Sequence, residues 1–411
     1  MAKALSEAGL DFEIAEATDH VGGNWAHGVY ETAHIISSKH TTEYPDWPMP
    51  AEYPDFPSAQ QMCAYYNDYA DAHGLREKIR FDSPVQSVRQ RDDELWDVTF
   101  EAERSVVYRG VVVCNGHHWD RDFPDWTGAF SGELLHSKDY KRPDQLRGKR
   151  VLVVGGGNSG CDVASEAARV SEYCAWSLRR GYWFMPKTVF GVPAVELTRP
   201  GIPLFVQRAA VKAMLRIVVG PYSKYGLPQP DHEIFDAHPT VSTEVFHYLK
   251  HGRLTPRGDV RSVDGMTVTF ADGTVEPFDT IVCATGYKVS FPFLDEGVVP
   301  VVGKVAALYG GMLRPDARHL YVMGTSQVRY GIGPLLRPLA ELLAEWVALQ
   351  DELEMPLGAV LKRAGQTLPT THLLEPHAAM ADLRRARRLT PALRKVAKGI
   401  ARLSTRRRAR R

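Results

Sequence analysis

The chain has 411 residues, 44% hydrophobic and 24% charged, a composition typical of a globular protein with two or three domains. Its five cysteines are scattered, odd in number and form no CxxC pair, which argues against a disulfide framework, a zinc site or a dithiol redox centre. With a net charge of +1, no apolar run of ~18 residues and no signal-peptide pattern, we expect a cytoplasmic protein with no transmembrane segment and no nucleic-acid partner.

The N-terminal residues predict the second half of a βαβ unit. A helix-forming segment ends at Gly9, where a left-handed cap is expected, and a short strand ends in Glu16. In dinucleotide-binding folds an acid at this point accepts a hydrogen bond from a ribose hydroxyl. In "VGGNW", Gly22 and Gly23 would let the backbone pass close to a dinucleotide, with Trp25 covering it. The alternative is a simple turn, and these residues alone do not decide.

Two later segments repeat one pattern, a hairpin followed by an apolar strand. The first, "VQSVRQRDDELWDVTF" with "VVYRGVVVCNG", stops at Gly116. The second, "VRSVDGMTVTFADGTVEPFDTIVCATG", turns at Asp272-Gly273 and stops at Gly286. Because each follows a nucleotide-type helix and strand, we interpret them as parts of two related dinucleotide folds. Two unrelated hairpins are the alternative.

A complete dinucleotide fingerprint lies in the middle of the chain. The strand 150–154 leads into "GGGNSG" at 155–160 and then into an Ala-rich helix, which is the context this motif needs. Its glycines permit a tight turn, and the helix N-terminus presents free amides to a pyrophosphate. The next strand ends in Arg179 and Arg180 instead of an acid, which suits a 2′-phosphate and favours NADPH over NADH. The alternative is a pair of surface arginines.

Two helices and a basic tail complete the chain. Leu204 to Val219 has the spacing of an amphipathic helix that packs on the body, and "PLLRPLAELLAEWVAL" predicts another helix. Residues 383–411 hold 13 Lys or Arg and no acid, whereas the rest of the chain carries 37 basic and 49 acidic residues. We expect this tail to be frayed and solvated.

Six motifs, taken in order, resemble those of the flavin-containing monooxygenase family over residues 1 to about 350. They are Glu16, "VGGNW", "SSKHTTEYPDWPMP", "FSGELLHSKDY", "GGGNSG" and "CATGY". The most specific is Phe130-x-Gly132-x-x-x-His136 followed by Tyr140, which is similar to the family's identifying segment and would connect two domains.

This resemblance implies an α/β fold with two Rossmann-like dinucleotide-binding domains, the NADPH domain being inserted in the FAD domain. The expected parts are a first FAD-binding part (1–145), the NADPH-binding domain (146–282), a second FAD-binding part (283–380) and the tail (381–411). The implied cofactors are FAD and NADPH. The implied activity is insertion of one oxygen atom from O2 into a soft nitrogen or sulfur nucleophile, a small-molecule substrate, through a flavin hydroperoxide. A homodimer is also expected.

The resemblance also assigns residues to the two cofactors. Those expected along FAD are Glu16, Gly22, Gly23, Asn24, Trp25, Ser38, Val85, Gly116 and Gln327. Those expected to hold NADPH are Gly155, Gly157, Asn158, Ser159, Gly160, Arg179 and Arg180. We nominate no catalytic triad, carboxylate pair or metal site, because the cofactor supplies the chemistry. His117 and His118 are interpreted as surface or packing residues.

The chain departs from the family pattern in two ways. Ile36 stands where the family usually has an Asn near the reactive flavin edge. The FAD glycine loop is also missing, so we expect roughly 15 to 20 further residues, a strand and GxGxxG, upstream of Met1. If they are absent, the chain holds flavin poorly.

Two other functions stay open at this point. One is Baeyer–Villiger oxygenation of a ketone by the same flavin, which Tyr140 weakly disfavours. The other is a flavin-deficient protein that binds NADPH without catalysis.

Overall fold

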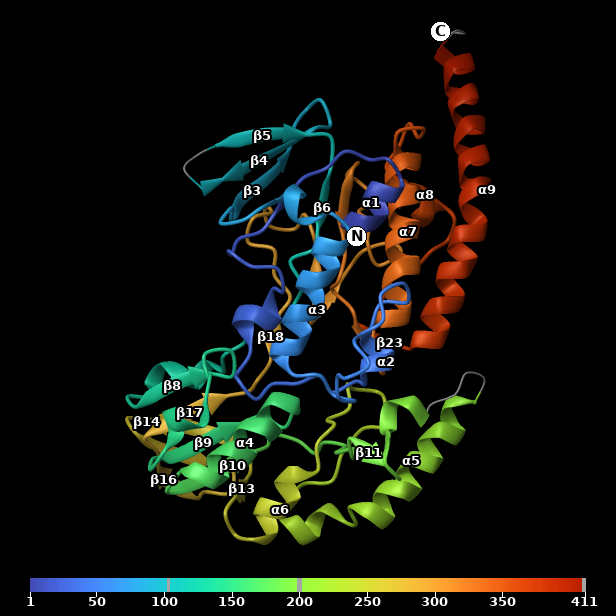
Figure 1. Ribbon diagram of the computed structural model, residues 1–411. Coiled ribbons are helices and arrows are strands. Elements are labelled where there is room, and N and C mark those ends of the chain that lie inside the picture. Colours follow the sequence, from blue (N-terminus) through green and yellow to red (C-terminus); the bar gives the residue numbers. More distant parts are fainter. Residues whose placement is uncertain (102–103, 198–201, 409–411) are drawn as a thin grey trace.

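The chain folds into two lobes, which Figure 1 shows one above the other. This computed structural model describes residues 1–101, 104–197 and 202–408, and the side chains only as far as residue 393. One lobe holds the chain's N-terminus and its last helices; the other is formed by a middle segment that leaves the first lobe and returns to it. The α/β architecture therefore has one lobe inserted into the other, as the sequence predicts.

The inserted lobe is built on a five-stranded parallel sheet. Its strand order is β13-β10-β9-β17-β8. The strands are β8 (Glu133–His136), β9 (Arg150–Val154), β10 (Tyr173–Ser177), β13 (Thr255–Arg257) and β17 (Thr280–Cys283). Edge strand β8 precedes residue 146, where the sequence places the start of the NADPH domain.

Each face of this sheet has its own cover. On one face, Val151, Val153 and Trp176 pack against α4 (Asn158–Val170) in a core that also contains α6 (Glu244–Lys250). On the other face, Leu152 and Ala175 pack against an antiparallel meander. Its strands are β14 (Val260–Asp264), β15 (Thr267–Phe270) and β16 (Val275–Pro277). Burial on both faces explains why the strands read as continuous apolar runs.

The other lobe repeats this plan with a less continuous sheet. Strands β3 (Val85–Gln90), β4 (Trp96–Phe100) and β5 (Ser105–Tyr108) form a meander that leads into β6 (Val111–Val113), as β14–β16 lead into β17. Strand β6 pairs in parallel with β21 (Leu320–Val322), and β1 (Ile14–Ala15) pairs in parallel with β2 (Ile79–Arg80). A third parallel pair joins β22 (Gln327–Val328) and β23 (Leu373–Leu374), so the described residues of this lobe hold three separate parallel pairs. The repeated meander supports the interpretation of two related dinucleotide folds.

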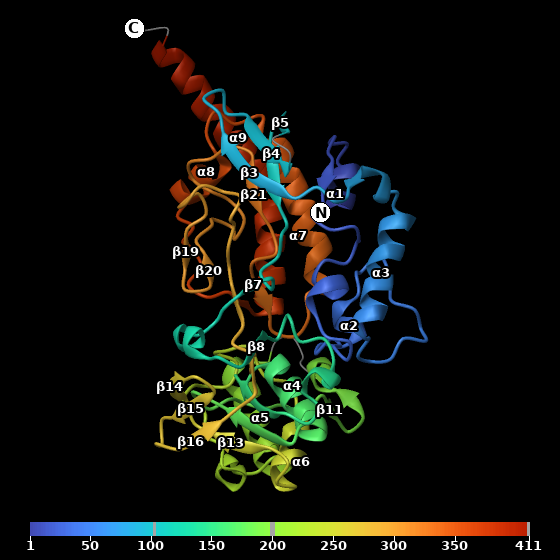
Figure 2. The same cartoon turned by 90° about the vertical axis from the view of Figure 1, so that its left-hand side faces the viewer.

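Helices pack around these strand pairs. Buried side chains of α1 (Ala2–Glu7), α7 (Gly333–Gln350) and α8 (Leu357–Arg363) form one core with Tyr321 of β21. In Figure 2, α3 (Ala59–Ala72) runs along the side that also carries α2 (Lys39–Thr42). The expected left-handed glycine after α1 is present, since Gly9 has a φ of 68°.

The basic tail is helical, which corrects the expectation that it is frayed. Helix α9 (Pro376–Arg408) packs on α7, and its end extends beyond the rest of the molecule (Figure 2). Arg387 pairs with Glu341 and Glu345, and Trp346 donates a hydrogen bond to Thr390. Once this part of α9 is fixed, each further turn adds hydrogen bonds without a new nucleation cost.

The amphipathic helix expected at 204–219 is present as α5 (Leu204–Val218), with Leu215 buried and Phe205 and Ile217 exposed. Among the residues described, no helix has the length and apolar character needed to cross a bilayer. The short strands that remain are β7 (Asp120–Arg121), β11 (Thr188–Val189), β12 (Val192–Pro193), β18 (Tyr287–Lys288), β19 (Val301–Val302) and β20 (Val305–Ala306).

Candidate cofactor sites

The glycine loop between β9 and α4 is built by close backbone packing. Gly155 has a φ of 116°, and a Cβ there would lie 2.3 Å from the carbonyl oxygen of Ala284. A Cβ on Gly160 would lie 2.1 Å from the oxygen of Gly155, so α4 can approach β9 only with glycine at this position. Gly157 caps α4 and faces open space. The loop thus leaves room for a pyrophosphate at the helix N-terminus.

The side chain of Asn158 holds a second segment against this loop. Its Oδ1 accepts a hydrogen bond of 2.7 Å from the Val241 amide, and Thr240 donates one of 2.9 Å to the Gly156 carbonyl. Ser159 interacts with the hydroxyl of Tyr30, which donates to Asp162 at 2.7 Å. Tyr30 comes from the other lobe, so the start of α4 lies where the lobes meet.

Arg179 and Arg180 follow β10 and are exposed. In the described part of the chain neither forms an ion pair within 4.0 Å, although the pKa of Asp231 is lowered by a hydrogen bond with His232 and, less strongly, by the charge of Arg180. The Arg180 guanidinium stacks on Tyr182, 5.6 Å from the ring centroid. Arg180 also borders a small pocket that is otherwise lined by Tyr182, Trp183, His232, Ile234, Phe235, Ala237, His238 and Pro239. Because Gly156 packs on Tyr182, this pocket adjoins the glycine loop. An exposed guanidinium at the border of this pocket, with a second one adjacent in sequence, suits the 2′-phosphate of NADPH.

On the other lobe, Glu16 ends the strand pair β1–β2. Its carboxylate accepts hydrogen bonds from the amide and the hydroxyl of Thr18, at 2.9 and 2.8 Å. Gly22 and Gly23 follow with φ values of 130° and 52°, conformations that favour glycine. A Cβ on Gly22 would lie 3.0 Å from the Cys63 sulfur, whereas Gly23 faces open space. The "VGGNW" stretch forms a turn, and its Trp25 is half-buried on a π-helical turn (Asn24–Gly28). Contact of this turn with a flavin stays a prediction.

Several buried polar atoms of Asn24 and of the segment after β6 have no protein partner in the described structure. They are Asn24 Oδ1, Asn115 Oδ1, His117 Nε2 and Trp119 Nε1, three of which belong to the segment that follows β6. A buried polar atom without a hydrogen bond costs about 1–3 kcal/mol. Gly116, in the same segment, has a φ of 70° and faces open space. This combination fits a large polar cofactor, and FAD is such a group.

The other residues expected along FAD have visible structural roles. Ser38 is fully buried and caps α2 through a hydrogen bond from Thr41. Val85 begins β3 beside the core formed with β6 and β21. The Gln327 side-chain amide donates to His118 Nε2 at 2.8 Å. Contact of these three residues with a flavin stays a prediction.

Sequence reasoning missed a cluster of histidines around His118. The pKa of His118 is lowered to about 3. Desolvation is the largest cause, and the nearby charges of His117, His238, Lys304 and His372 add to it in decreasing order. Burial also lowers the pKa of His117, His238 and His372. These residues come from distant parts of the chain, and no local motif marks them. At neutral pH the imidazole of His118 is uncharged.

The segment from Phe130 to Tyr140 carries edge strand β8 of the inserted lobe, and the Tyr140 ring lies 5.9 Å from the ring of Tyr30 in the other lobe. Its role as a connection between the domains stays a prediction. His136 is fully buried, accepts from the Lys138 amide at 3.1 Å and donates to the Gly286 carbonyl at 2.9 Å. The buried hydroxyl of Tyr140 donates to Glu166 on α4. This segment therefore ties β8 to the end of β17 and to the helix that follows the glycine loop.

A complete glycine loop with a basic pair, facing a second lobe with a ribose-type acid and unpaired polar atoms, defines a flavoprotein with two dinucleotide sites. The chain belongs to the flavin-binding monooxygenase-like family, whose model matches residues 3–351. Flavin-containing monooxygenase 5 of Oryctolagus cuniculus is 32% identical over 378 residues, which are 84% of this chain and 70% of that protein. Flavin-containing monooxygenase 2 of Homo sapiens is 31% identical over 380 residues, 84% and 69% of the two chains.

Solved structures share the fold. A flavin-containing monooxygenase from Stenotrophomonas maltophilia superposes with a TM-score of 0.63 at 21% identity, covering 84% of this chain and 94% of that one. OTEMO, solved in complex with FAD and NADP, gives a TM-score of 0.68 at 18% identity and covers 85% and 82%. The expected fold, the FAD and NADPH cofactors and the class of NADPH-dependent flavoprotein monooxygenase are thereby confirmed.

Proposed function

We propose that this enzyme transfers one oxygen atom from O2 to a soft nitrogen or sulfur nucleophile on a small molecule. The unpaired buried atoms of Asn24, Asn115 and His117, together with the open space at Gly116, carry the proposal, because they fit a polar cofactor in the lobe that lacks the NADPH-type loop. A relative from Macaca mulatta, 29% identical, is named dimethylaniline monooxygenase [N-oxide-forming] 2, and that name supports nitrogen as the acceptor atom.

The residues of this chain bind and orient the reactants. The amides at the start of α4 would hold the NADPH pyrophosphate, Arg179 and Arg180 its 2′-phosphate, and Glu16 a ribose hydroxyl of FAD. Bound flavin, once reduced by NADPH, supplies the activation of dioxygen. One oxygen atom would enter the substrate, and the other would leave as water, formed with the hydride of NADPH and one proton from the solvent.

The histidine cluster sets the charge of the region between the lobes. Because the pKa of His118 is about 3, the ring stays neutral across the physiological range and accepts from Gln327. We propose that the imidazoles of this cluster stay uncharged and so add little positive charge beside the flavin. Among the cluster residues described, the permanent cation is Lys304, which pairs with Asp122 at 3.3 Å.

Competing acceptors test the proposal directly. The full-length chain, supplied with FAD, NADPH and isotopically labelled dioxygen, is offered a tertiary amine, a thioether and a cyclic ketone. We expect label in the N-oxide or the sulfoxide, with NADPH consumed in step. A labelled lactone from the ketone alone would replace the proposal with Baeyer–Villiger oxygenation. A colourless chain that binds NADPH and transfers no label would be the flavin-deficient protein.

The remaining expectations stay predictions. They are the domain boundaries at residues 146, 283 and 381, the cofactor contacts of the individual residues, the homodimer and the cytoplasmic location. Light scattering on the purified chain, with and without cofactors, measures its oligomeric state.

A further inference from the structure

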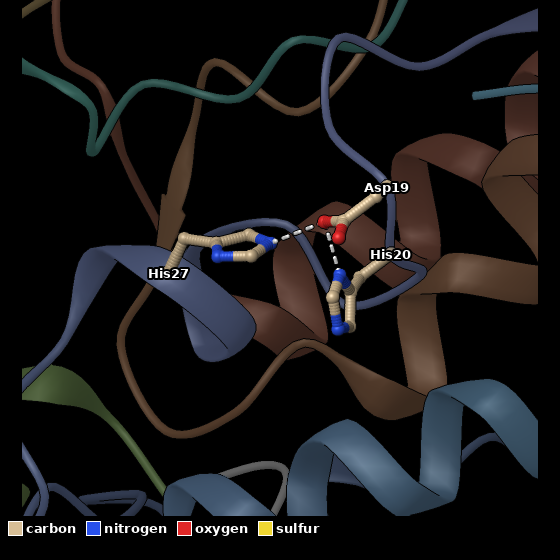
Figure 3. A group of neighbouring side chains, drawn as sticks. All are labelled: Asp19, His20 and His27. Carbon is tan, nitrogen blue, oxygen red and sulfur yellow. Dashed lines mark hydrogen bonds and ion pairs between the residues drawn. The ribbon is translucent and has the colours of Figure 1, made fainter. Parts of the chain in front are cut away.

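Three metal-ligating side chains meet beside the glycines of the "VGGNW" turn. Asp19, His20 and His27 each offer one ligand atom, and these atoms lie within 4.8 Å of one another. Figure 3 shows both imidazoles directed at the Asp19 carboxylate. His20 Nδ1 is hydrogen-bonded to Asp19 Oδ1, and His27 Nε2 lies 3.6 Å from the same oxygen. In the described part of the chain, no other group of three such donors comes this close.

Hydrogen bonds from several directions fix the backbone that carries these side chains. The amides of Ala26 and His27 donate to the Gly23 carbonyl, which fixes the turn that carries His27. Lys141 donates to the His27 carbonyl at 2.9 Å. On the other side of the turn, Asn67 of α3 donates to the Val21 carbonyl at 3.1 Å, next to His20. The three donors are therefore positioned before any ion binds, which lowers the ordering cost of binding.

The donor set selects the class of ion. Two imidazoles and one carboxylate suit zinc and other late first-row divalent ions, whereas magnesium and calcium prefer oxygen ligands alone. The side chains of Asp19, His20 and His27 are 60%, 51% and 43% exposed, so a hydrated ion has access to them. The Asp19 carboxylate, which both imidazole rings approach, also places a negative charge next to the position of the cation. The rings of the two histidines lie edge to face, with their centroids 4.9 Å apart.

We propose that Asp19, His20 and His27 form a surface site for a divalent transition ion of the zinc type, with water completing the coordination. The ion would join the residues before and after Gly22-Gly23, and would thereby restrain the turn that follows Glu16. The site goes beyond the oxygenase function, because binding of the ion there needs neither NADPH nor flavin.

A second pair of histidines makes a matched control necessary. His247 and His251 lie one turn apart on and just after α6, with ring centroids 4.2 Å apart, and such a pair binds zinc weakly without a carboxylate. The test therefore starts from the untagged full-length chain carrying His247→Gln and His251→Gln. Calorimetry with Zn²⁺ alone measures binding, and the visible spectrum with Co²⁺ reports the coordination geometry.

We expect one Zn²⁺ per chain in this background and a Co²⁺ spectrum of low coordination number. Adding His27→Gln or Asp19→Asn should weaken Zn²⁺ binding at least about tenfold, since each removes one of three protein ligands. Adding His40→Gln, an exposed histidine beside Glu43, should leave it unchanged. Mg²⁺ should not compete. Loss of all Zn²⁺ binding in the starting background, or equal affinity with and without His27, would overturn the proposal.

Discussion

The two dinucleotide regions share a fold plan, but they differ in how continuous their parallel sheets are and in how many of their buried polar atoms have a protein partner. Around Gly155–Gly160 the five parallel strands form one continuous sheet, and the backbone packs so closely that a Cβ on Gly155 or Gly160 would lie 2.3 or 2.1 Å from a carbonyl oxygen. In the lobe of Glu16 and Gly116 the described parallel strands form three separate pairs, and Asn24, Asn115 and His117 keep buried atoms without partners.

The two sites should therefore depend on their ligands to different degrees. The NADPH region is preorganised, so its residues should affect folding and binding separately. The FAD region has unpaired buried groups whose cost a bound cofactor would offset, so its stability should depend on the ligand. Changes at single residues test whether the two regions differ in this way.

The largest effect is expected from the glycine that lets α4 approach β9. Gly160→Ala places a Cβ 2.1 Å from a backbone oxygen and should lower the free energy of unfolding by roughly 3 kcal/mol, measured by chemical denaturation. The matched variant Gly157→Ala faces open space and should change it by less than about 0.5 kcal/mol. Equal stability of the two variants would mean that the loop is not rigidly packed.

The next effect concerns the basic pair after β10. Arg179→Gln with Arg180→Gln should weaken NADPH binding roughly 30- to 100-fold, about 2–3 kcal/mol, because charge-assisted hydrogen bonds to the 2′-phosphate are lost. NADH binding should not change, and neither should NADPH binding by Arg216→Gln, an exposed arginine on α5. Fluorescence titration measures both affinities. An unchanged preference for NADPH would place its 2′-phosphate elsewhere.

A smaller effect is expected at the buried contact between Tyr140 and α4. Tyr140→Phe removes a buried hydroxyl from Glu166 and should cost about 1–2 kcal/mol of unfolding free energy. Tyr53→Phe, whose partly buried hydroxyl makes a 3.3 Å bond to the Gln61 carbonyl, serves as control and should cost less than about 0.5 kcal/mol. If Tyr140→Phe proves neutral, the hydroxyl does not contribute to the link between β8 and α4.

The smallest effect is a dependence of stability on pH. The folded chain holds the pKa of His118 at about 3, whereas an unfolded histidine titrates near pH 6.5. Below that pH the unfolded chain binds more protons, so the free energy of unfolding should fall as pH decreases from about 7 to about 5.

Denaturation at several pH values measures this slope. His118→Gln should reduce the fall, while His40→Gln, outside the cluster, should leave it unaltered. A slope of opposite sign, or one that His118→Gln does not alter, would remove His118 from the explanation.

The sequence predicts those parts of the structure that local rules determine. The fingerprint at 155–160, the apolar strands β9 and β10 and the Asp272-Gly273 turn each follow from neighbouring residues, and the structure has all of them. The histidine cluster was not predictable in this way, because His118, His238 and His372 meet only through the tertiary fold. The helical tail was missed for a related reason: its anchor, Arg387 against Glu341, joins residues far apart in sequence.

The most direct test of the account is the colour and turnover of the full-length chain supplied with FAD. We predict that the purified complex is yellow, that NADPH bleaches the flavin absorbance without oxygen, and that in air NADPH is consumed as oxygen enters an amine or a thioether. A colourless chain that leaves NADPH unoxidised in air would contradict the assignment of two cooperating cofactor sites.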